Sequence, residues 1–336
     1  MAKQTTMMGP WVRRFLIEHL IGERNLAHNT QRSYRDTFCQ LLPFITKDAG
    51  EAIDHLVVDD LSPEMVRRFL AHIEGQRHCG ARTRNQRLAA IHAFARFVAE
   101  RSPEHIAWCT GLRAVPFKRF DRAALCYLDK PEIDALIAAP DCSCSIGRRD
   151  HALLLFLYNT GAKASEVASV TIGDIESRPD GTGSVRLVGK GAKTRYCPLW
   201  PTTLTKVMAL TGKRALTEKL FINQRGQPLT RYGIYGIVRR HAKVISMTLK
   251  SVQNKHIGPH TIRHTTATHL LRAGVDINTI RGWLGHVSID TTNIYAEIDL
   301  EAKAEILEQC EHFQPRAAKK KRWKDDHTLM HFLRAL

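Results

Sequence analysis

The sequence predicts a mainly α-helical protein in two parts, with one small antiparallel sheet in the second part. Apolar residues recur at three- and four-residue spacing in most segments, which is typical of amphipathic helices. Residues 183–199 instead alternate apolar and polar residues on both sides of a Gly-Lys-Gly centre, as a β-hairpin does. Residues 116–124 contain a proline and several basic residues, and this stretch predicts a linker between the two parts.

Residues 1–115 are expected to form a helical bundle. The predicted helices span residues 10–20, 30–44, 63–74 and 83–101. The last of these carries Arg82, Arg84 and Arg87 on the face opposite its apolar stripe. A basic face of this kind suits a polyanion, and an ordinary solvated helix face is the alternative interpretation.

Residues 125–315 are expected to form the second, mostly helical part. Asp129 is a candidate N-cap for its first helix, with Pro131 in the first turn. Lys190 falls at the turn of the predicted hairpin. The other predicted helices span residues 150–158, 232–246, 259–273 and 276–284. A basic and amphipathic tail, residues 316–336, follows.

The composition is that of a soluble globular protein with room for two cores. The chain has 336 residues, of which 43% are hydrophobic and 25% charged. No apolar run approaches the ~20 residues needed to cross a bilayer, and no signal-peptide pattern is evident. We therefore expect no membrane association and a cytoplasmic location, in a bacterium at the nucleoid. The 8 cysteines are scattered and are expected to be reduced thiols.

The charge balance predicts a polyanionic partner. The chain has 50 Lys plus Arg against 33 Asp plus Glu. Basic side chains that neutralise phosphates release condensed counterions, which gives sequence-independent affinity for nucleic acid. An anionic membrane surface is the alternative, but the chain lacks an anchoring helix. The candidate contacts to DNA are Arg82, Arg84, Arg87, Lys118 and Arg119.

Most of the candidate reactive residues lie between residues 259 and 295 of the chain. Pro259 starts a predicted helix in which His260 and Arg263 lie three residues apart, so both project from one face and can converge on one phosphate. Gly285 is placed to end the next helix, which puts His286 in a tight turn, and Tyr295 follows nine residues later. A lone tyrosine on a helix is usually structural, but the joint pattern indicates a nucleophile aimed at a phosphate.

A metal site is not predicted. His260 and His264 are four residues apart and could in principle be metal ligands. No glutamate lies between them as in the metalloprotease signature, and Arg263 would repel a cation. Cys142 and Cys144 are too few for a zinc site and are interpreted as free thiols in a loop.

These motifs resemble those of the tyrosine recombinases of the phage integrase family. The similarity rests on His-x-x-Arg at His260 and Arg263, on Leu-Gly-His ending in His286, and on Tyr295. Residues 29–34 and 83–97 also resemble the family's helical core-binding domain, so the resemblance covers nearly the whole chain. It implies the DNA breaking-rejoining fold, with a DNA-binding core-binding domain, a basic linker, a catalytic domain and a C-terminal tail.

The resemblance implies a role for each site residue. Tyr295 would attack the scissile phosphate and form a 3′-phosphotyrosyl link, which conserves the bond energy for rejoining without a cofactor. Arg263 would clamp the phosphate oxygens, His260 would assist proton transfer and His286 would hydrogen-bond a nonbridging oxygen. Lys190 would protonate the leaving 5′-oxygen, although Lys193 is close enough in sequence to compete for that role.

One position departs from the family's pattern. The segment that carries the first catalytic arginine in the family has lysine here, at Lys163, between Gly161 and Glu166. Lysine keeps the positive charge but loses the planar fork, so we expect slower cleavage. Both a natural lysine and a substitution engineered to trap a DNA complex fit the pattern. Glu166 would support the site structurally.

The resemblance also implies an assembly and leaves two alternatives open. The expected enzyme is a site-specific recombinase that serves a mobile element or a chromosome. It is expected to act on double-stranded DNA as a homotetramer on two sites, with its C-terminal tail docked on a neighbouring protomer. Strands would be exchanged through a Holliday junction, and the product could be integration, excision, resolution or inversion. The alternatives are a type IB topoisomerase and a DNA-binding protein whose Lys163 reflects lost catalysis.

Overall fold

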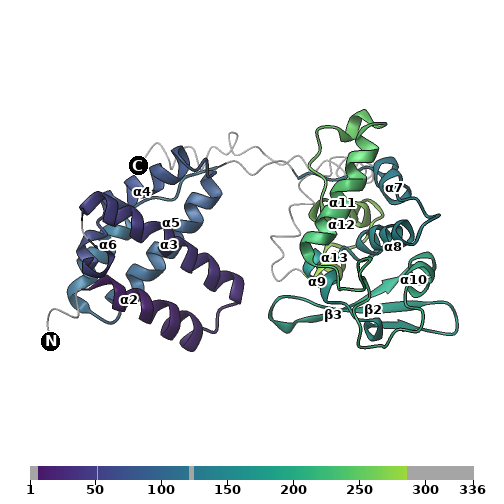
Figure 1. The fold of residues 1–336 in the computed structure, drawn as a ribbon, viewed down its shortest axis with the longest axis horizontal. Coiled ribbons are helices and arrows are strands. Elements are labelled where there is room, and N and C mark those ends of the chain that lie inside the picture. Colours follow the sequence, from purple (N-terminus) through teal and green to yellow (C-terminus); the bar gives the residue numbers. More distant parts are fainter. Residues whose placement is uncertain (1–6, 51, 121–124, 286–336) are drawn as a thin grey trace, which may run out of the picture. The chain divides into compact units, whose positions relative to one another are not determined.

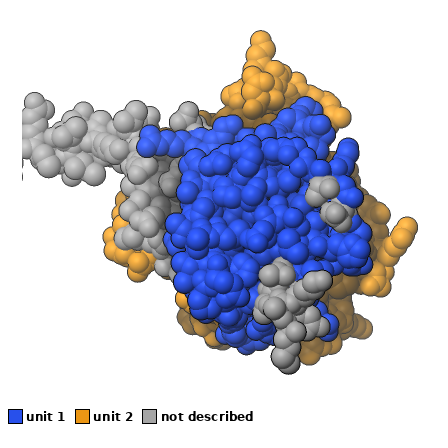
Figure 2. All heavy atoms as spheres, turned by 90° about the vertical axis from the view of Figure 1, so that its left-hand side faces the viewer, with its two compact units in different colours: residues 1–123 blue, residues 124–336 orange. Residues whose placement is uncertain are grey.

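The chain is mainly helical with one small antiparallel sheet, as the sequence predicts. A computed structural model describes residues 7–50, 52–120 and 125–285 (Figure 1). The chain forms two compact units, residues 1–123 and residues 124–336, each with its own hydrophobic core (Figure 2). Among the helices of the described ranges, none is long and apolar enough to cross a membrane.

The described regular structure of the first unit is helical apart from one isolated β-bridge between Met7 and Val57. Its elements are α2 (Met8–Arg14), which continues into a π-helix (Phe15–Glu23), α3 (His28–Ala49), α4 (Pro63–Gly75), α5 (Ala81–Ala99), α6 (Ile106–Arg113) and short 3-10 turns at Ile53–His55, Val58–Asp60 and Pro103–His105. The residues at the start of α4 show why a helix begins there. The Ser62 hydroxyl caps the helix by accepting from the Met65 N–H, and Pro63 occupies the first helical position.

Aromatic rings fill the centre of the first unit. The Phe15 ring lies 5.5 Å from that of Phe94 and 6.0 Å from that of Phe38, both edge-on. Such edge-to-face pairs add to the free energy gained by burying the rings. They tie the π-helix to α3 and α5.

The second unit combines helices with the sheet. Its elements are α7 (Lys130–Ala138), α8 (Ser145–Thr160), α9 (Ala164–Ser169), β1 (Ile175–Ser177), β2 (Gly183–Val188), β3 (Thr194–Leu199), α10 (Pro201–Met208), α11 (Arg231–Ser246), α12 (Pro259–Arg272), α13 (Ile277–Leu284) and 3-10 turns at Ile172–Asp174, Lys190–Ala192 and Lys250–Val252. Helices α8 and α12 pack against each other (Figure 1).

The predicted hairpin is present as β2 and β3. The two strands pair antiparallel from Gly183 opposite Leu199 to Val188 opposite Thr194, and β1 adds a third strand beside β2. Alternate residues, among them Val185 on β2, face the core. The turn between the strands contains Gly191 with a φ of 73°, a conformation that glycine adopts without strain.

Helices α8 and α13 both end at a left-handed glycine. Gly161 follows α8 with a φ of 58°, and Gly285 follows α13 with a φ of 67°, as predicted for Gly285. A Cβ atom at Gly161 would lie 2.5 Å from the Leu284 Cδ2 atom. Glycine therefore allows the end of α8 to approach the end of α13 closely, and this approach builds the site described next.

Candidate functional site

Arg263 joins three segments of the second unit that are distant in sequence. Its side chain is buried, and it donates from Nη1 to the Gly161 carbonyl at 2.7 Å and from Nη2 to the Leu284 carbonyl at 2.6 Å. A buried guanidinium needs such acceptors to offset the loss of its hydration. Arg263 therefore holds the segment that leads to Lys163 against the segment that leads to His286.

A second arginine, Arg195 on β3, links the same region from the sheet. Its two terminal nitrogens each donate to one carboxylate oxygen of Glu166 at 2.8 Å, and its Nε donates to the Trp283 carbonyl at 2.8 Å. The side chains of Arg195 and Glu166 are only 10% and 3% exposed. Arg195 is not evident from the sequence, because nothing local to β3 marks this residue as the partner of Glu166.

Glu166 is kept ionised by this pairing. Burial disfavours the charged carboxylate, but the hydrogen bonds and charge of Arg195 outweigh that effect and hold the pKa of Glu166 below its ordinary value. The Glu166 carboxylate also accepts from the Lys163 N–H at 2.8 Å, which fixes the start of α9. Glu166 thus positions the backbone of Lys163.

Lys163 and His260 line one cavity of about 580 Å³. Lys163 precedes α9 in an extended conformation, and His260 is the second residue of α12. Tyr232 and Tyr235 of α11 line the same cavity. The structure therefore brings together two of the six predicted catalytic residues at the edge of a cavity, with a lysine ammonium and an imidazole that can both contact an anion.

The imidazole of His260 is set up to be neutral at pH 7. Partial desolvation lowers the pKa of His260, and the positive charges of Arg263 and Lys163 act in the same direction. The ring of His264 stacks on it, with centroids 5.6 Å apart and an angle of 9° between the planes. Burial, followed by the effect of His260 and Arg263, lowers the pKa of His264 to about 4. A neutral His260 can accept a proton from a reacting group.

The remaining predicted catalytic residues are placed only in part. Lys190 lies in the turn between β2 and β3, as predicted, and the structure describes its backbone. His286 and Tyr295 lie outside the described residues. So does the predicted amphipathic tail, residues 316–336.

The basic residues predicted to contact DNA differ in whether their side chains bond within the first unit or are exposed on its surface. Arg84 donates to the Pro116 carbonyl at 3.1 Å, and Arg87 donates to the Ser33 carbonyl at 3.0 Å, so both stabilise the packing of the first unit. Lys118 is exposed and forms an ion pair with Glu74 at 2.9 Å. Arg82 and Arg119 are exposed. These last three side chains lie on the surface, where a partner can reach them.

Comparison with known proteins identifies the family. The model of the phage integrase family matches residues 127–301, and that of the phage integrase N-terminal SAM-like domain matches residues 12–102. The chain belongs to the phage integrase family. The resemblance that the sequence analysis drew from His260, Arg263, His286 and Tyr295 is confirmed.

Relatives of this integrase-family chain are similar over nearly their whole length. The integrase/recombinase y4rC of Sinorhizobium fredii is 36% identical over 332 residues, which is 98% of each chain. The tyrosine recombinase XerC of Pelobacter propionicus is 32% identical over 300 residues, covering 87% of this chain and 92% of the relative.

Solved structures show the same fold. The XerH site-specific recombinase bound to its difH substrate matches with a TM-score of 0.65 at 18% identity, covering 87% of this chain and 82% of that one. The Tn1549 transposon integrase in complex with a circular intermediate DNA matches with a TM-score of 0.68 at 16% identity, covering 89% and 98%.

Proposed function

We propose that this member of the phage integrase family is a site-specific DNA recombinase. The observation that carries the proposal is the pair of bonds from Arg263 to the carbonyls of Gly161 and Leu284. These bonds hold together the segments that lead to Lys163 and to His286, in a chain that belongs to a family of recombinases. The net charge of +17 suits a DNA substrate.

The reaction follows from the chemistry of the named side chains. The Tyr295 oxygen attacks the scissile phosphorus, forms the 3′-phosphotyrosyl bond and displaces the 5′-oxygen of the next nucleotide. His260, neutral at pH 7, assists transfer of the tyrosine proton, and Lys190 protonates the leaving oxygen. His286 hydrogen-bonds a nonbridging oxygen, and the positive charge of Arg263, whose Nη1 and Nη2 donate to the Gly161 and Leu284 carbonyls, stabilises the negative charge that builds up on the phosphate electrostatically. Rejoining reverses these steps on a different 5′-hydroxyl.

Lys163 slows this reaction without preventing DNA binding. A lysine ammonium at the cavity edge supplies charge but cannot hold two phosphate oxygens in one plane. Loss of a preorganised oxyanion donor typically lowers the rate by ~10²–10³-fold, and because a cation is retained here the loss is smaller. Lys163 is thus the specific observation that favours a second candidate function, a DNA-binding protein with lost catalysis.

The same proposal includes the oligomeric assembly and the separate roles of the two units. A homotetramer binds two DNA sites and exchanges strands through a Holliday junction, with the C-terminal tail docked on a neighbour. The first unit is the core-binding domain and the second is the catalytic domain. Exposed Arg82 and Arg119 of the first unit are suited to contact the DNA backbone.

The test is covalent capture of DNA. A footprint on DNA from the flanks of the gene defines a binding site, and a nicked duplex that carries this site traps the cleaved intermediate. The native chain should form a protein–DNA adduct that resists denaturing gel electrophoresis, and Tyr295→Phe should bind the same duplex without forming it. Lys163→Arg should form the adduct faster than the native chain does. The rate increase should be smaller than the ~10²–10³-fold that a complete oxyanion donor typically contributes.

Two outcomes would contradict the proposal. Binding without any adduct in Lys163→Arg would favour the DNA-binding protein over the recombinase. Equal rates of adduct formation in the native chain and in Lys163→Arg would show that Lys163 does not impair cleavage.

A further inference from the structure

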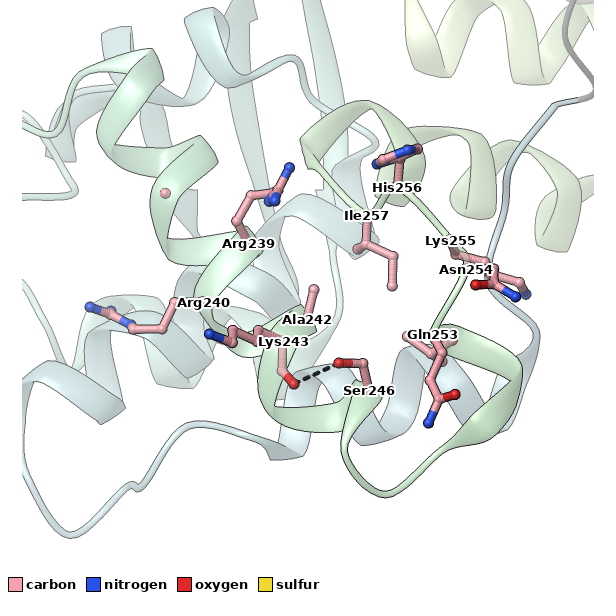
Figure 3. Close-up of a pocket in the computed structure, with 12 residues that line it drawn as sticks. Arg239, Arg240, Ala242, Lys243, Ser246, Gln253, Asn254, Lys255, His256 and Ile257 are labelled. Carbon is pink, nitrogen blue, oxygen red and sulfur yellow. Dashed lines mark hydrogen bonds between the residues drawn. The ribbon is translucent and has the colours of Figure 1, made fainter.

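A second basic cavity lies next to the one that contains Lys163 and His260. It has a volume of about 620 Å³ and lies between α11 and residues 252–257 (Figure 3). Its charged and titratable lining residues are Arg239, Arg240, Lys243, Lys255 and His256, and none of its 12 lining residues carries a carboxylate. The cavity is therefore suited to an anion.

Two of these cations form ion pairs with carboxylates that do not line the cavity. Arg240 donates to the buried Asp150 at 2.5 Å, and Lys255 donates to Glu132 at 2.5 Å. In Figure 3 the Arg240 side chain accordingly points away from the other labelled lining residues. These two side chains are explained by the ion pairs that they form within the protein.

Arg239 and Lys243 supply the charge that remains. Both are exposed, lie one turn apart on α11 and line the cavity. Lys243 is in the last turn of its helix, where a cation also interacts favourably with the helix dipole. That effect does not extend to Arg239, which lies further from the helix end and has its guanidinium 5.9 Å from the Tyr235 ring centre.

Gly236 gives an independent indication of a ligand. It lies in the interior of α11, is exposed, and lines the same cavity. A Cβ atom at Gly236 would meet no protein atom within 4 Å, so internal packing does not require glycine here. Glycine destabilises a helix interior relative to alanine. Close approach of a ligand to the helix backbone is a physical reason for accepting that loss.

His256 connects this cavity to the candidate active site, because it lines both cavities. An anion with regularly repeated charges can therefore fill the two cavities side by side. We propose that the second cavity binds a backbone phosphate of the DNA substrate near the phosphate that is cleaved, neutralised by Lys243 and Arg239 and brought close to α11 by Gly236. This inference rests on the proposed function, since it takes the neighbouring cavity as the site of cleavage.

The first test measures how DNA affinity depends on salt. Each phosphate contact that is removed lowers the slope of log K against log salt concentration by ~0.9. Lys243→Ala is therefore expected to lower the slope for a short duplex of unrelated sequence by about one. Lys206→Ala is the matched control, because Lys206 is an exposed lysine on α10, which does not line this cavity. Equal slopes for the two variants would overturn the proposal.

The second test separates stability from binding. Gly236→Ala should melt at the same temperature as the native chain or higher, yet bind the duplex less tightly, because the new methyl group occupies the surface that the phosphate approaches. Gly9→Ala is the control, since Gly9 is also an exposed helical glycine with no atom within 4 Å of a built Cβ. Unchanged binding in Gly236→Ala would overturn the proposal.

Covalent capture keeps the two proposals distinguishable. If the Tyr295-dependent adduct forms while Lys243→Ala leaves the salt slope unchanged, the second cavity is not a phosphate site and the recombinase proposal stands. If the slope falls but no adduct forms even in Lys163→Arg, the cavity binds DNA and the recombinase proposal fails.

Discussion

Removing the Glu166 carboxylate should destabilise the second unit strongly. In Glu166→Ala the guanidinium of Arg195, only 10% exposed, loses both of its 2.8 Å carboxylate contacts while remaining buried. Breaking a buried ion pair from one side typically costs about 3–5 kcal/mol, because the remaining charge is left unpaired. For a unit of the size of residues 124–336, each kcal/mol shifts the melting temperature by about 2–4 °C. The expected decrease is therefore about 6–20 °C.

Differential scanning calorimetry of the full chain measures this decrease. The matched control is Asp134→Ala in the same unit, which breaks an ion pair between Lys130 and Asp134 whose side chains are 65% and 53% exposed. Exposed pairs one helical turn apart contribute only ~0.3–0.5 kcal/mol, so this variant should melt within about 2 °C of the native chain. If Glu166→Ala melts as close to the native chain as the control does, the Arg195–Glu166 pair does not hold the site together.

Two further predictions follow from the same region. Gly161→Ala should lower the free energy of unfolding by more than the ~1–2 kcal/mol that a left-handed backbone costs a residue with a Cβ atom, because that Cβ would lie 2.5 Å from Leu284 Cδ2. Gly226→Ala, with a φ of 73° and no atom within 4 Å of the built Cβ, should lower it only by the cost of the backbone strain. Chemical denaturation compares the two variants, and equal decreases would refute the close approach. His264, with its pKa lowered to about 4, should stay neutral in NMR titrations down to pH 5. Since the unfolded chain takes up this proton near pH 6.5 and the folded chain only near pH 4, stability should decrease as the pH falls through that window, and His264→Gln should reduce the decrease.

The sequence was sufficient for the elements whose start, turn or end is marked by local residues. The hairpin of residues 183–199 and the helix ending at Gly285 could be predicted because their signals are local. Helix α3 ends at Ala49 and not at the predicted residue 44, and Ile45, just beyond the predicted end, is fully buried, so core packing continues the helix.

Short elements and long-range partners escaped prediction for a different reason. Helices α6 and α10 have 8 residues each and β1 has 3, so their periods are short; α13 is as short, but Asp276 at its start and Gly285 at its end mark it in the sequence. Arg195 and Glu166 are 29 residues apart in sequence, and only the tertiary fold, in which α9 contacts β2 and β2 pairs with β3, brings them together. The motif residues of the candidate site are therefore a prediction from local sequence, whereas Arg195, which holds Glu166 beside the backbone of Lys163, is recognised only in the folded structure.

The backbone on both sides of Lys163 is fixed by other groups. The Gly161 carbonyl accepts from Arg263, and the Lys163 N–H donates to Glu166. Lys163→Arg should therefore change the head group at the cavity edge while shifting the melting temperature by no more than about 2 °C, as expected of a half-buried substitution that keeps its charge. Any gain in cleavage rate then measures what a planar guanidinium contributes over a point charge. If Lys163→Arg cleaves faster and also melts at a much higher temperature than the native chain, the slow native rate would instead result from an incompletely folded site.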